Sequence, residues 1–218
     1  AMDPQQWLLL KHTWHAMENS HIDVPSSSMG VFIGIWNVDY RQIAALQLQD
    51  EPNFHFGTGT SPSVAAGRIA YHFDFQGPTL VIDTACSSGL VALSVAELSV
   101  ADNRCSSAIV GAVNVILDSA IHRHFSAAGM LSPDSRCKTF DDSANGYVRS
   151  EACVVLVVSV GKGEMASAQL LACEINQDGR SGGITVPNKT AQQSLISTST
   201  VRAGGARVQF FETHGTGT

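Results

Sequence analysis

The segment from Leu80 to Leu93 constrains the fold of this chain more than any other. It opens with a short apolar stretch typical of a buried strand, passes through a turn of small residues, and continues as a helix that is apolar on nearly every side. Cys86 lies in the turn, at the N-terminal end of that helix. Unpaired N–H groups and the positive end of the helix dipole favour a thiolate there. Cys86 is therefore a candidate nucleophile for acyl groups.

A purely structural role is the alternative for Cys86, because most free cysteines only fill space in a core. The neighbouring residues favour the catalytic interpretation. Core positions are usually occupied by residues such as valine and leucine. Here the sulfur is instead surrounded in sequence by small polar residues at the junction of strand and helix: Asp83, Thr84, Ser87 and Ser88.

Periodicity and turn signals predict alternating helices and strands along the chain. Asp3, Pro4 and Gln6 form a helix start, with a cap, a first-turn proline and a glutamine three residues after the cap. This alternation indicates an α/β fold built around a layered sheet. We expect helices over 4–19, 62–71, 87–100 and 190–203, and strands over 29–35, 80–83, 108–116, 153–160, 169–176 and 207–212.

Composition narrows the class of protein. Hydrophobic residues make up 44% of the 218 residues and charged residues only 15%, which suits a large buried core. A net charge of −6 without clusters of lysine and arginine argues against nucleic acid or anionic membrane as a partner. No apolar run approaches the roughly 18 residues of a membrane span, and the start has no signal-peptide pattern. Five widely spaced cysteines without a C-x-x-C pair are expected to be reduced thiols in a cytoplasmic protein, with no disulfide and no zinc site.

The cysteine turn and several further segments of the chain match motifs of a single protein family. In this order along the chain, they resemble motifs of the β-ketoacyl synthases, specifically those of type I polyketide synthases and multidomain fatty acid synthases. The matching segments are 1–6, 57–73, Leu80–Leu93, 128–134, 136–141, Gly146-Tyr147-Val148-Arg149, 176–181 and His214-Gly215-Thr216-Gly217-Thr218.

The resemblance implies a thiolase-like fold, which has two similar halves in five layers. Residues 1–218 would be a partial ketosynthase domain, truncated at both ends and comprising mostly the N-terminal half. A first strand, the motif with a second catalytic histidine and a late glycine-rich loop are not found in it. We therefore expect a translated gene fragment that is inactive by itself.

The same resemblance implies the chemistry. Cys86 would take an acyl group from acyl carrier protein as a thioester, and a malonyl-type extender would lose carbon dioxide and attack it. His214 would stabilise the developing enolate oxygen, while backbone N–H groups would hold the thioester oxyanion. Thr216 and Thr218 match positions whose hydroxyls bind the pantetheine chain. No cofactor is bound directly, because phosphopantetheine belongs to the carrier protein. Other polyketide synthase domains and a second copy of the complete domain are the further expected partners.

Two alternatives remain open at this point: a thiolase-fold acyltransferase or hydrolase that does not catalyse condensation, and a non-catalytic ketosynthase homologue.

The chain also departs from the family pattern at several positions. Ser150-Glu151-Ala152 replaces a usual Gly-Glu-Gly, which would cost about 1 kcal/mol at a position that requires positive φ. Gly89 replaces a frequent serine and is expected to weaken the helix slightly. His122 and His124 are expected on a short helix without a third metal ligand.

Overall fold

The computed structural model describes residues 2–20, 26–48, 52–161 and 166–217. Its strands are β1 (Met29–Gly34), β2 (Thr79–Ile82), β3 (Ser107–Asn114) and β4 (Ala152–Ser159). Its helices are α1 (Pro4–Ser20), α2 (Asp39–Leu48), α3 (Phe56–Thr60), α4 (Pro62–Phe73), α5 (Ser88–Ala101), α6 (Ala120–Ala127) and α7 (Lys189–Arg202), with 3₁₀ turns η1 (Ser26–Ser28) and η2 (Ala85–Ser87).

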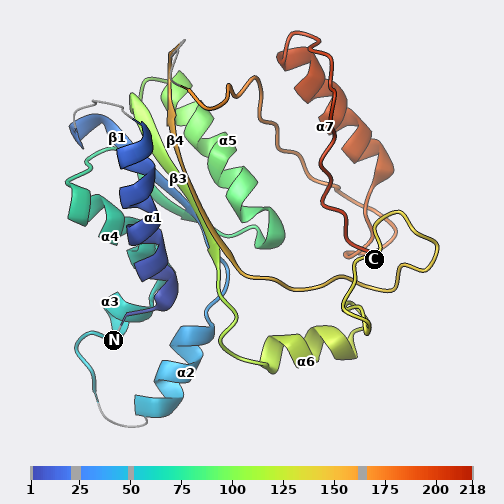
Figure 1. The fold of residues 1–218 in the computed structure, drawn as a ribbon, viewed down its shortest axis with the longest axis horizontal. Coiled ribbons are helices and arrows are strands. Elements are labelled where there is room, and N and C mark those ends of the chain that lie inside the picture. The colour runs from blue at the N-terminus through green and yellow to red at the C-terminus, as the bar shows by residue number, and fades with distance from the viewer. Residues whose placement is uncertain (1, 21–25, 49–51, 162–165, 218) are drawn as a thin grey trace.

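The strands form one four-stranded sheet in the order β2-β1-β3-β4 (Figure 1). β1 lies inside the sheet and runs parallel to β2 and β3, so that Gly34 is paired with Ile82 on one side and with Ala112 on the other. β4 is antiparallel to β3, with Ala152 opposite Asn114. The carboxyl ends of the three parallel strands therefore meet at one edge of the sheet, where ligands commonly bind in α/β proteins.

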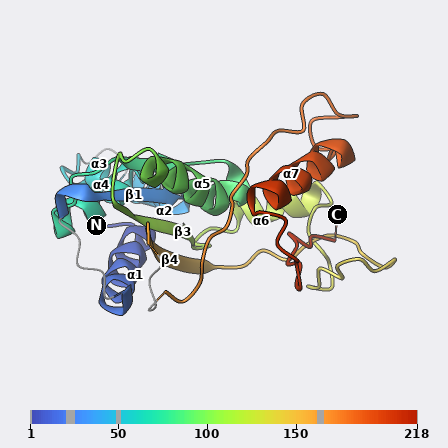
Figure 2. The same cartoon turned by 90° about the horizontal axis from the view of Figure 1, so that it is seen from above.

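Helices cover both faces of the sheet (Figures 1 and 2). Val31 and Ile33 of β1 pack with Leu9 of α1 and with residues of α4, whereas Phe32 packs with Ala92 and other residues of α5. Successive residues of a strand point to opposite faces, and every residue of β1 is buried. The fold is therefore a layered α/β arrangement, as the sequence predicts.

Small residues let α5 approach the sheet closely. A Cβ on Gly34 would lie 2.6 Å from the carbonyl carbon of Ser88, and a Cβ on Gly89 would lie 2.9 Å from Cβ of Ala112. The first turn of α5 therefore rests directly on β1 and β3. Gly89 was expected only to weaken the helix, but in the structure its missing side chain makes this contact possible.

The start of α1 confirms one part of its prediction and corrects another. The carboxylate of Asp3 accepts a hydrogen bond from the backbone N of Gln5 (2.8 Å), as a cap does. The side chain of Gln6 does not return to the cap. Its Nε2 donates to the carbonyl O of Ser61 (3.3 Å), and its Oε1 accepts from Nε of Arg68 (2.8 Å). Gln6 thus joins α1 to α4.

The structure confirms most of the predicted elements to within a few residues, but the strands predicted over 169–176 and 207–212 are wrong. A strand requires a neighbour that exchanges backbone hydrogen bonds with it. The described sheet ends at β2 and β4 without including either segment. Their apolar side chains stay exposed, with 53% of Leu171 and 91% of Phe210 accessible. Helices α2 and α3 were not predicted. None of the described helices is long and apolar enough to cross a membrane.

Candidate active site

Cys86 is exposed and lies in η2, between the carboxyl end of β2 and the start of α5. The preceding residue, Ala85, has φ of +55°. An L-residue other than glycine pays about 1–2 kcal/mol for this left-handed conformation. Strain of this kind is retained where surrounding interactions fix the backbone, and it is concentrated at functional sites. The turn therefore presents the sulfur to solvent in a fixed, locally strained conformation.

The polar neighbours of Cys86 hold this turn in place. Ala85 N donates to Oδ1 of Asp83 (3.0 Å), and Thr84 N donates to Oγ of Ser88 (2.9 Å). The Ser88 hydroxyl donates in turn to the carbonyl O of Ala85 (2.7 Å). Ser87 Oγ donates to the carbonyl O of Thr84 (2.9 Å). The small polar residues that the sequence places around the sulfur thus bind the backbone of the turn, an established role of serine, threonine and aspartate.

A pocket of about 560 Å³ opens between α6 and two loops. This volume lies within the roughly 300–1,000 Å³ that is usual for small-molecule sites. The loops are joined by hydrogen bonds from Tyr147 N to Met130 O (3.0 Å) and from Ser132 N to Tyr147 O (3.0 Å). The residues that shape its chemistry are mostly hydrogen-bond donors: His122, Ser126, Ser132, Asn145, Tyr147 and Arg149.

Tyr147, which lines this pocket, has a phenol whose pKa is shifted by its surroundings. Burial raises the pKa of the Tyr147 phenol, the positive charge of Arg149 lowers it, and negative charge on Cys86 raises it. In the sequence Tyr147 lies 61 positions after Cys86. The sequence singled out Gly146-Tyr147-Val148-Arg149 as a motif but did not predict the pocket.

The C-terminal histidine motif is attached to the same loops. Gly146 N donates to the carbonyl O of Gly217 (2.8 Å), and the Thr139 hydroxyl donates to the carbonyl O of Gly215. A Cβ on Gly217 would lie 2.0 Å from the carbonyl O of Cys137, so only glycine fits this contact. Figures 1 and 2 place the C-terminal end together with these loops, to one side of the sheet.

The individual residues of this motif differ in their exposure to solvent. His214 is exposed and Thr216 is partly buried. Thr218 lies outside the described residues. Within the described ranges, Cys86 and His214 share no hydrogen bond. The structure brings the histidine motif to the loops of the pocket but does not join the two predicted catalytic side chains directly.

A buried polar network, which sequence reasoning missed, positions the connection from β3 to α6. Oδ2 of Asp39 accepts from the backbone N of Leu117 (3.0 Å) and of Asp118 (3.1 Å). Nδ2 of Asn37 donates to the carbonyl O of Val115 (2.8 Å). Both Asn37 and Asp39 are almost completely buried. Since α6 supplies one wall of the pocket, this network fixes that wall relative to the sheet.

Residues 150–152, where the sequence departs from the usual Gly-Glu-Gly of the family, do not show the backbone strain that positive φ would cause. Neither Ser150 nor Ala152 has positive φ. The carboxylate of Glu151 accepts from Ile116 N (2.7 Å), and the carbonyl O of Ser150 accepts from Nδ2 of Asn114 (2.8 Å). The segment therefore holds the end of β3 beside the start of β4, and the conditional cost of about 1 kcal/mol does not arise.

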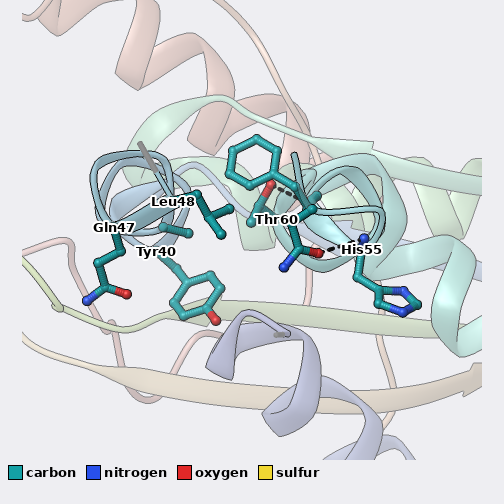
Figure 3. Close-up of a pocket in the computed structure, with 8 residues that line it drawn as sticks. Tyr40, Gln47, Leu48, His55 and Thr60 are labelled. Atoms are coloured by element: carbon teal, nitrogen blue, oxygen red, sulfur yellow. Dashed lines mark hydrogen bonds between the residues drawn. The ribbon is translucent and has the colours of Figure 1, made fainter. Parts of the chain in front are cut away.

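Other candidate sites are weaker. His122 and His124 lie on α6 as expected, and no group of three potential metal-ligating side chains is found within the described part of the chain. A second pocket, of about 90 Å³, lies between α2 and α3 and is lined by Tyr40, Leu48 and Thr60 (Figure 3). It is well below the usual size of ligand pockets. The Thr60 hydroxyl is already bonded to the carbonyl O of Phe56 (2.7 Å).

Comparison with known protein families shows which family the chain belongs to. Residues 1–162 match the N-terminal domain of β-ketoacyl synthases, and residues 167–218 match the C-terminal domain. The chain belongs to the β-ketoacyl synthase family. Its relatives include a cyclo-acetoacetyl-L-tryptophan synthase of Aspergillus oryzae, 42% identical, and a phenolphthiocerol/phthiocerol polyketide synthase of Mycobacterium tuberculosis, 40% identical. Both alignments include the whole of this chain, but only 6% and 10% of the respective relatives.

Solved ketosynthases confirm the fold. The ketosynthase from module 6 of the bacillaene synthase of Bacillus subtilis superimposes with a TM-score of 0.84 at 32% identity. The oxazolomycin ketosynthase domain from Streptomyces albus gives a TM-score of 0.82, also at 32% identity. This β-ketoacyl synthase chain covers 39% of each of these structures. Its layered α/β fold is therefore thiolase-like, as the resemblance implied.

Proposed function

We propose that this chain forms part of a condensing domain that extends acyl chains by decarboxylative Claisen condensation in polyketide biosynthesis. The Cys86 thiolate attacks the acyl thioester of a carrier protein, and the pantetheine thiol of that carrier leaves with a proton. A malonyl-type extender then loses carbon dioxide. The resulting enolate attacks the Cys86 thioester, a β-ketoacyl carrier protein forms, and the Cys86 sulfur is released.

This proposal rests mainly on the position of Cys86 in the structure. An exposed cysteine on a strained, hydrogen-bonded turn at the head of a partly buried helix is costly to maintain for packing alone. The start of α5 supplies backbone N–H groups and a positive dipole at the same point. Those groups favour both the thiolate and the oxyanion that forms when an acyl thioester is attacked.

The remaining roles come from the family resemblance. His214 acts on the extender unit, where it stabilises the enolate oxygen. Thr216 and Thr218 bind the pantetheine chain, which the acyl carrier protein supplies, and no cofactor is needed on the chain itself. The attachment of residues 214–217 to the pocket loops supports this arrangement. In the complete protein we propose a homodimer working with other polyketide synthase domains in the cytoplasm.

Cys86→Ala in the complete domain tests the central role. We expect no transfer of acyl groups from acyl carrier protein, with an unchanged circular dichroism spectrum. The matched control is Cys173→Ala, which alters a partly buried thiol outside the pocket and should still be acylated. Intact-mass spectrometry measures both. Undiminished acylation of the Cys86→Ala protein would refute the assignment.

A second measurement separates condensation from the alternatives. The acylated domain is incubated with malonyl carrier protein, and release of carbon dioxide is followed together with the carrier-bound product. A β-ketoacyl product supports the condensing enzyme. Hydrolysis or simple transfer without loss of carbon dioxide would indicate a non-condensing acyltransferase or hydrolase, and the absence of any acylation would indicate a non-catalytic homologue.

A further inference from the structure

The loop that precedes β4 holds the backbone of the C-terminal histidine motif at two points. The Thr139 hydroxyl donates to the carbonyl O of Gly215, and Gly146 N donates to the carbonyl O of Gly217 (2.8 Å). Gly215 directly follows His214, whereas Gly217 is three positions beyond it. Within the described residues, His214 itself makes no hydrogen bond. The bond from Thr139 is therefore the backbone restraint closest to His214.

Gly215 fits closely against Thr139. A Cβ on Gly215 would lie 3.2 Å from Oγ1 and 3.3 Å from Cγ2 of Thr139, which is tighter than nine in ten such contacts. Gly215 also has φ of +64°, a left-handed conformation that glycine adopts without steric cost. The direction in which the chain leaves His214 is thus set by the conformation of Gly215 and by its contact with Thr139.

The backbone on both sides of Thr139 is strained. Lys138 has φ of +48° and Phe140 has φ of +62°. Residues with a bulky side chain rarely adopt this conformation, and it persists where the surrounding structure fixes it. An ion pair from Lys138 Nζ to Asp134 (2.8 Å) and a bond from Asp141 N to the carbonyl O of Lys138 (3.1 Å) hold the segment. The loop therefore presents the Thr139 hydroxyl to the motif in a fixed conformation.

We propose that Thr139 is a positioning residue for His214 in the decarboxylation half-reaction. By holding the carbonyl O of Gly215, its hydroxyl sets the backbone from which the His214 side chain acts on the extender unit. This inference rests on the proposed function and adds a residue to it. A small displacement of His214 would weaken its effect, because a group that stabilises developing charge must meet it at hydrogen-bond distance. Thr139 is exposed and belongs to neither hydrophobic cluster of the core, so its role is not one of packing.

The test compares two substitutions of Thr139 in the complete domain. Thr139→Val removes the hydroxyl and keeps the branched shape, whereas Thr139→Ser keeps the hydroxyl. For Thr139→Val we expect kcat for decarboxylation of malonyl carrier protein to fall about three- to tenfold, the effect of one hydrogen bond, with KM nearly unchanged. Acyl loading of Cys86 should keep the parent rate, and Thr139→Ser should restore decarboxylation. Carbon dioxide release and intact-mass spectrometry measure the two half-reactions.

A double variant shows whether Thr139 acts through His214. Once alanine replaces His214 there is no imidazole to position, so Thr139→Val should not slow the His214→Ala domain any further. Thr200→Val is the matched control, because the Thr200 hydroxyl also donates to a carbonyl O, that of Ile196 on α7 (2.8 Å). It should leave both half-reactions unchanged. If Thr139→Val does not fold, Thr139→Ala removes the same hydroxyl and must show the same loss.

Three outcomes overturn the inference while leaving the proposed function intact. In the first, Thr139→Val decarboxylates like the parent, or loses loading and decarboxylation equally, as expected if Thr139 only stabilises the fold. In the second, KM for malonyl carrier protein rises and kcat does not change, which would assign Thr139 to carrier binding. In the third, Thr139→Val slows the His214→Ala domain as much as the parent. Normal decarboxylation by His214→Ala alone would instead refute the role proposed for His214, and the inference with it.

Discussion

At the residue scale, the five cysteines differ in their access to solvent. Cys86 is exposed, Cys105 is buried, and the others are intermediate. Burial raises the pKa of Cys105 and of Cys173, and raises that of Cys153 to about 11. Since the thiolate is the reactive form, buried thiols of raised pKa react slowly. Cys86 is thus the one exposed thiol of the five, and burial makes three of the others less reactive.

This difference predicts a labelling order. At pH 8, iodoacetamide should alkylate Cys86 before Cys153, because a thiol with a pKa of about 11 is only about one part in a thousand thiolate. Raising the pH to 10 should increase the thiolate fraction of Cys153 about a hundredfold, and its labelling with it, while the domain stays folded. Peptide mass spectrometry of the complete domain measures both sites. Equal rates at pH 8 would contradict the assignment of Cys86 as the accessible nucleophile.

His214→Ala should separate two half-reactions of the complete domain. We expect acyl loading of Cys86 to continue, while decarboxylation of malonyl carrier protein falls about 10²–10⁴-fold, as for hydrogen-bonding and acid–base residues generally. Loading and carbon dioxide release are measured separately. Lost loading with normal decarboxylation would reverse the role given to His214, and no change in either would leave it structural.

Sequence reasoning identified Cys86 because strand, small-residue turn and apolar helix are consecutive in the chain. The pocket could not be predicted from the sequence in this way. Tyr147 and Arg149 come from a loop 61 and 63 positions after Cys86, and their place in the pocket depends on loop contacts such as Ser132 N to Tyr147 O. The one usable signal was the motif Gly146-Tyr147-Val148-Arg149, which the family resemblance singled out.

At the element scale, the contact of α5 with the sheet determines where the nucleophile lies. The contact is made by backbone against backbone at Gly34 and Ser88. A side chain inserted here cannot be absorbed by rotation, since the neighbouring atoms belong to the main chain. The helix start, and with it Cys86, would have to move away from β1.

Gly34→Ala is therefore expected to destabilise the complete domain by about 1–3 kcal/mol, the usual cost of overpacking a tight core. Gly67→Ala is the matched control, because a Cβ on this α4 residue meets nothing within 4 Å. Replacing a helical glycine by alanine should stabilise by up to about 1 kcal/mol. Urea denaturation of both variants gives the two free energies of unfolding. Equal effects would show that the contact at Gly34 is not tight.

Element prediction succeeded where a segment is continuously apolar and bounded by turns, as for β1 and α5. It failed for 169–176 and 207–212, where apolar residues indicated strands but no neighbouring strand pairs with them. α2 was missed because only Asp39 and Ala44 are buried, so that its apolar pattern is weak. Its start is instead fixed by a local bond from Asp39 N to Oδ1 of Asn37 (2.8 Å), a signal that is easily overlooked in a sequence.

At the scale of the whole molecule, the two parts of the chain are packed very differently. The sheet and helices α1, α4 and α5 form the layered core, whereas α7 stands beside α5 (Figure 1). Arg202 joins α7 to Glu97 of α5 (2.9 Å) and to Glu174. Many large apolar side chains remain exposed, among them Leu90, Val154, Leu170, Ile184, Phe210 and Phe211.

The purified 218-residue chain should therefore lack a single cooperative thermal transition. Each large apolar side chain left in water forgoes roughly 1.5–3 kcal/mol of burial, and folded domains have only about 5–15 kcal/mol of net stability. Differential scanning calorimetry and binding of an apolar dye measure the effect. A sharp transition without dye binding would show that the chain is stable as it stands.

The place of β1 inside the sheet has a consequence for synthesis on the ribosome. Both neighbours of β1 come later in the chain, and β3 ends 80 residues after β1, at Asn114. At about 5–20 residues per second, translation leaves the apolar residues Val31, Phe32 and Ile33 without their complete sheet for roughly 4–16 s. The strand at the centre of the core is thus made before the partners that enclose it, and during that interval it is a target for chaperones.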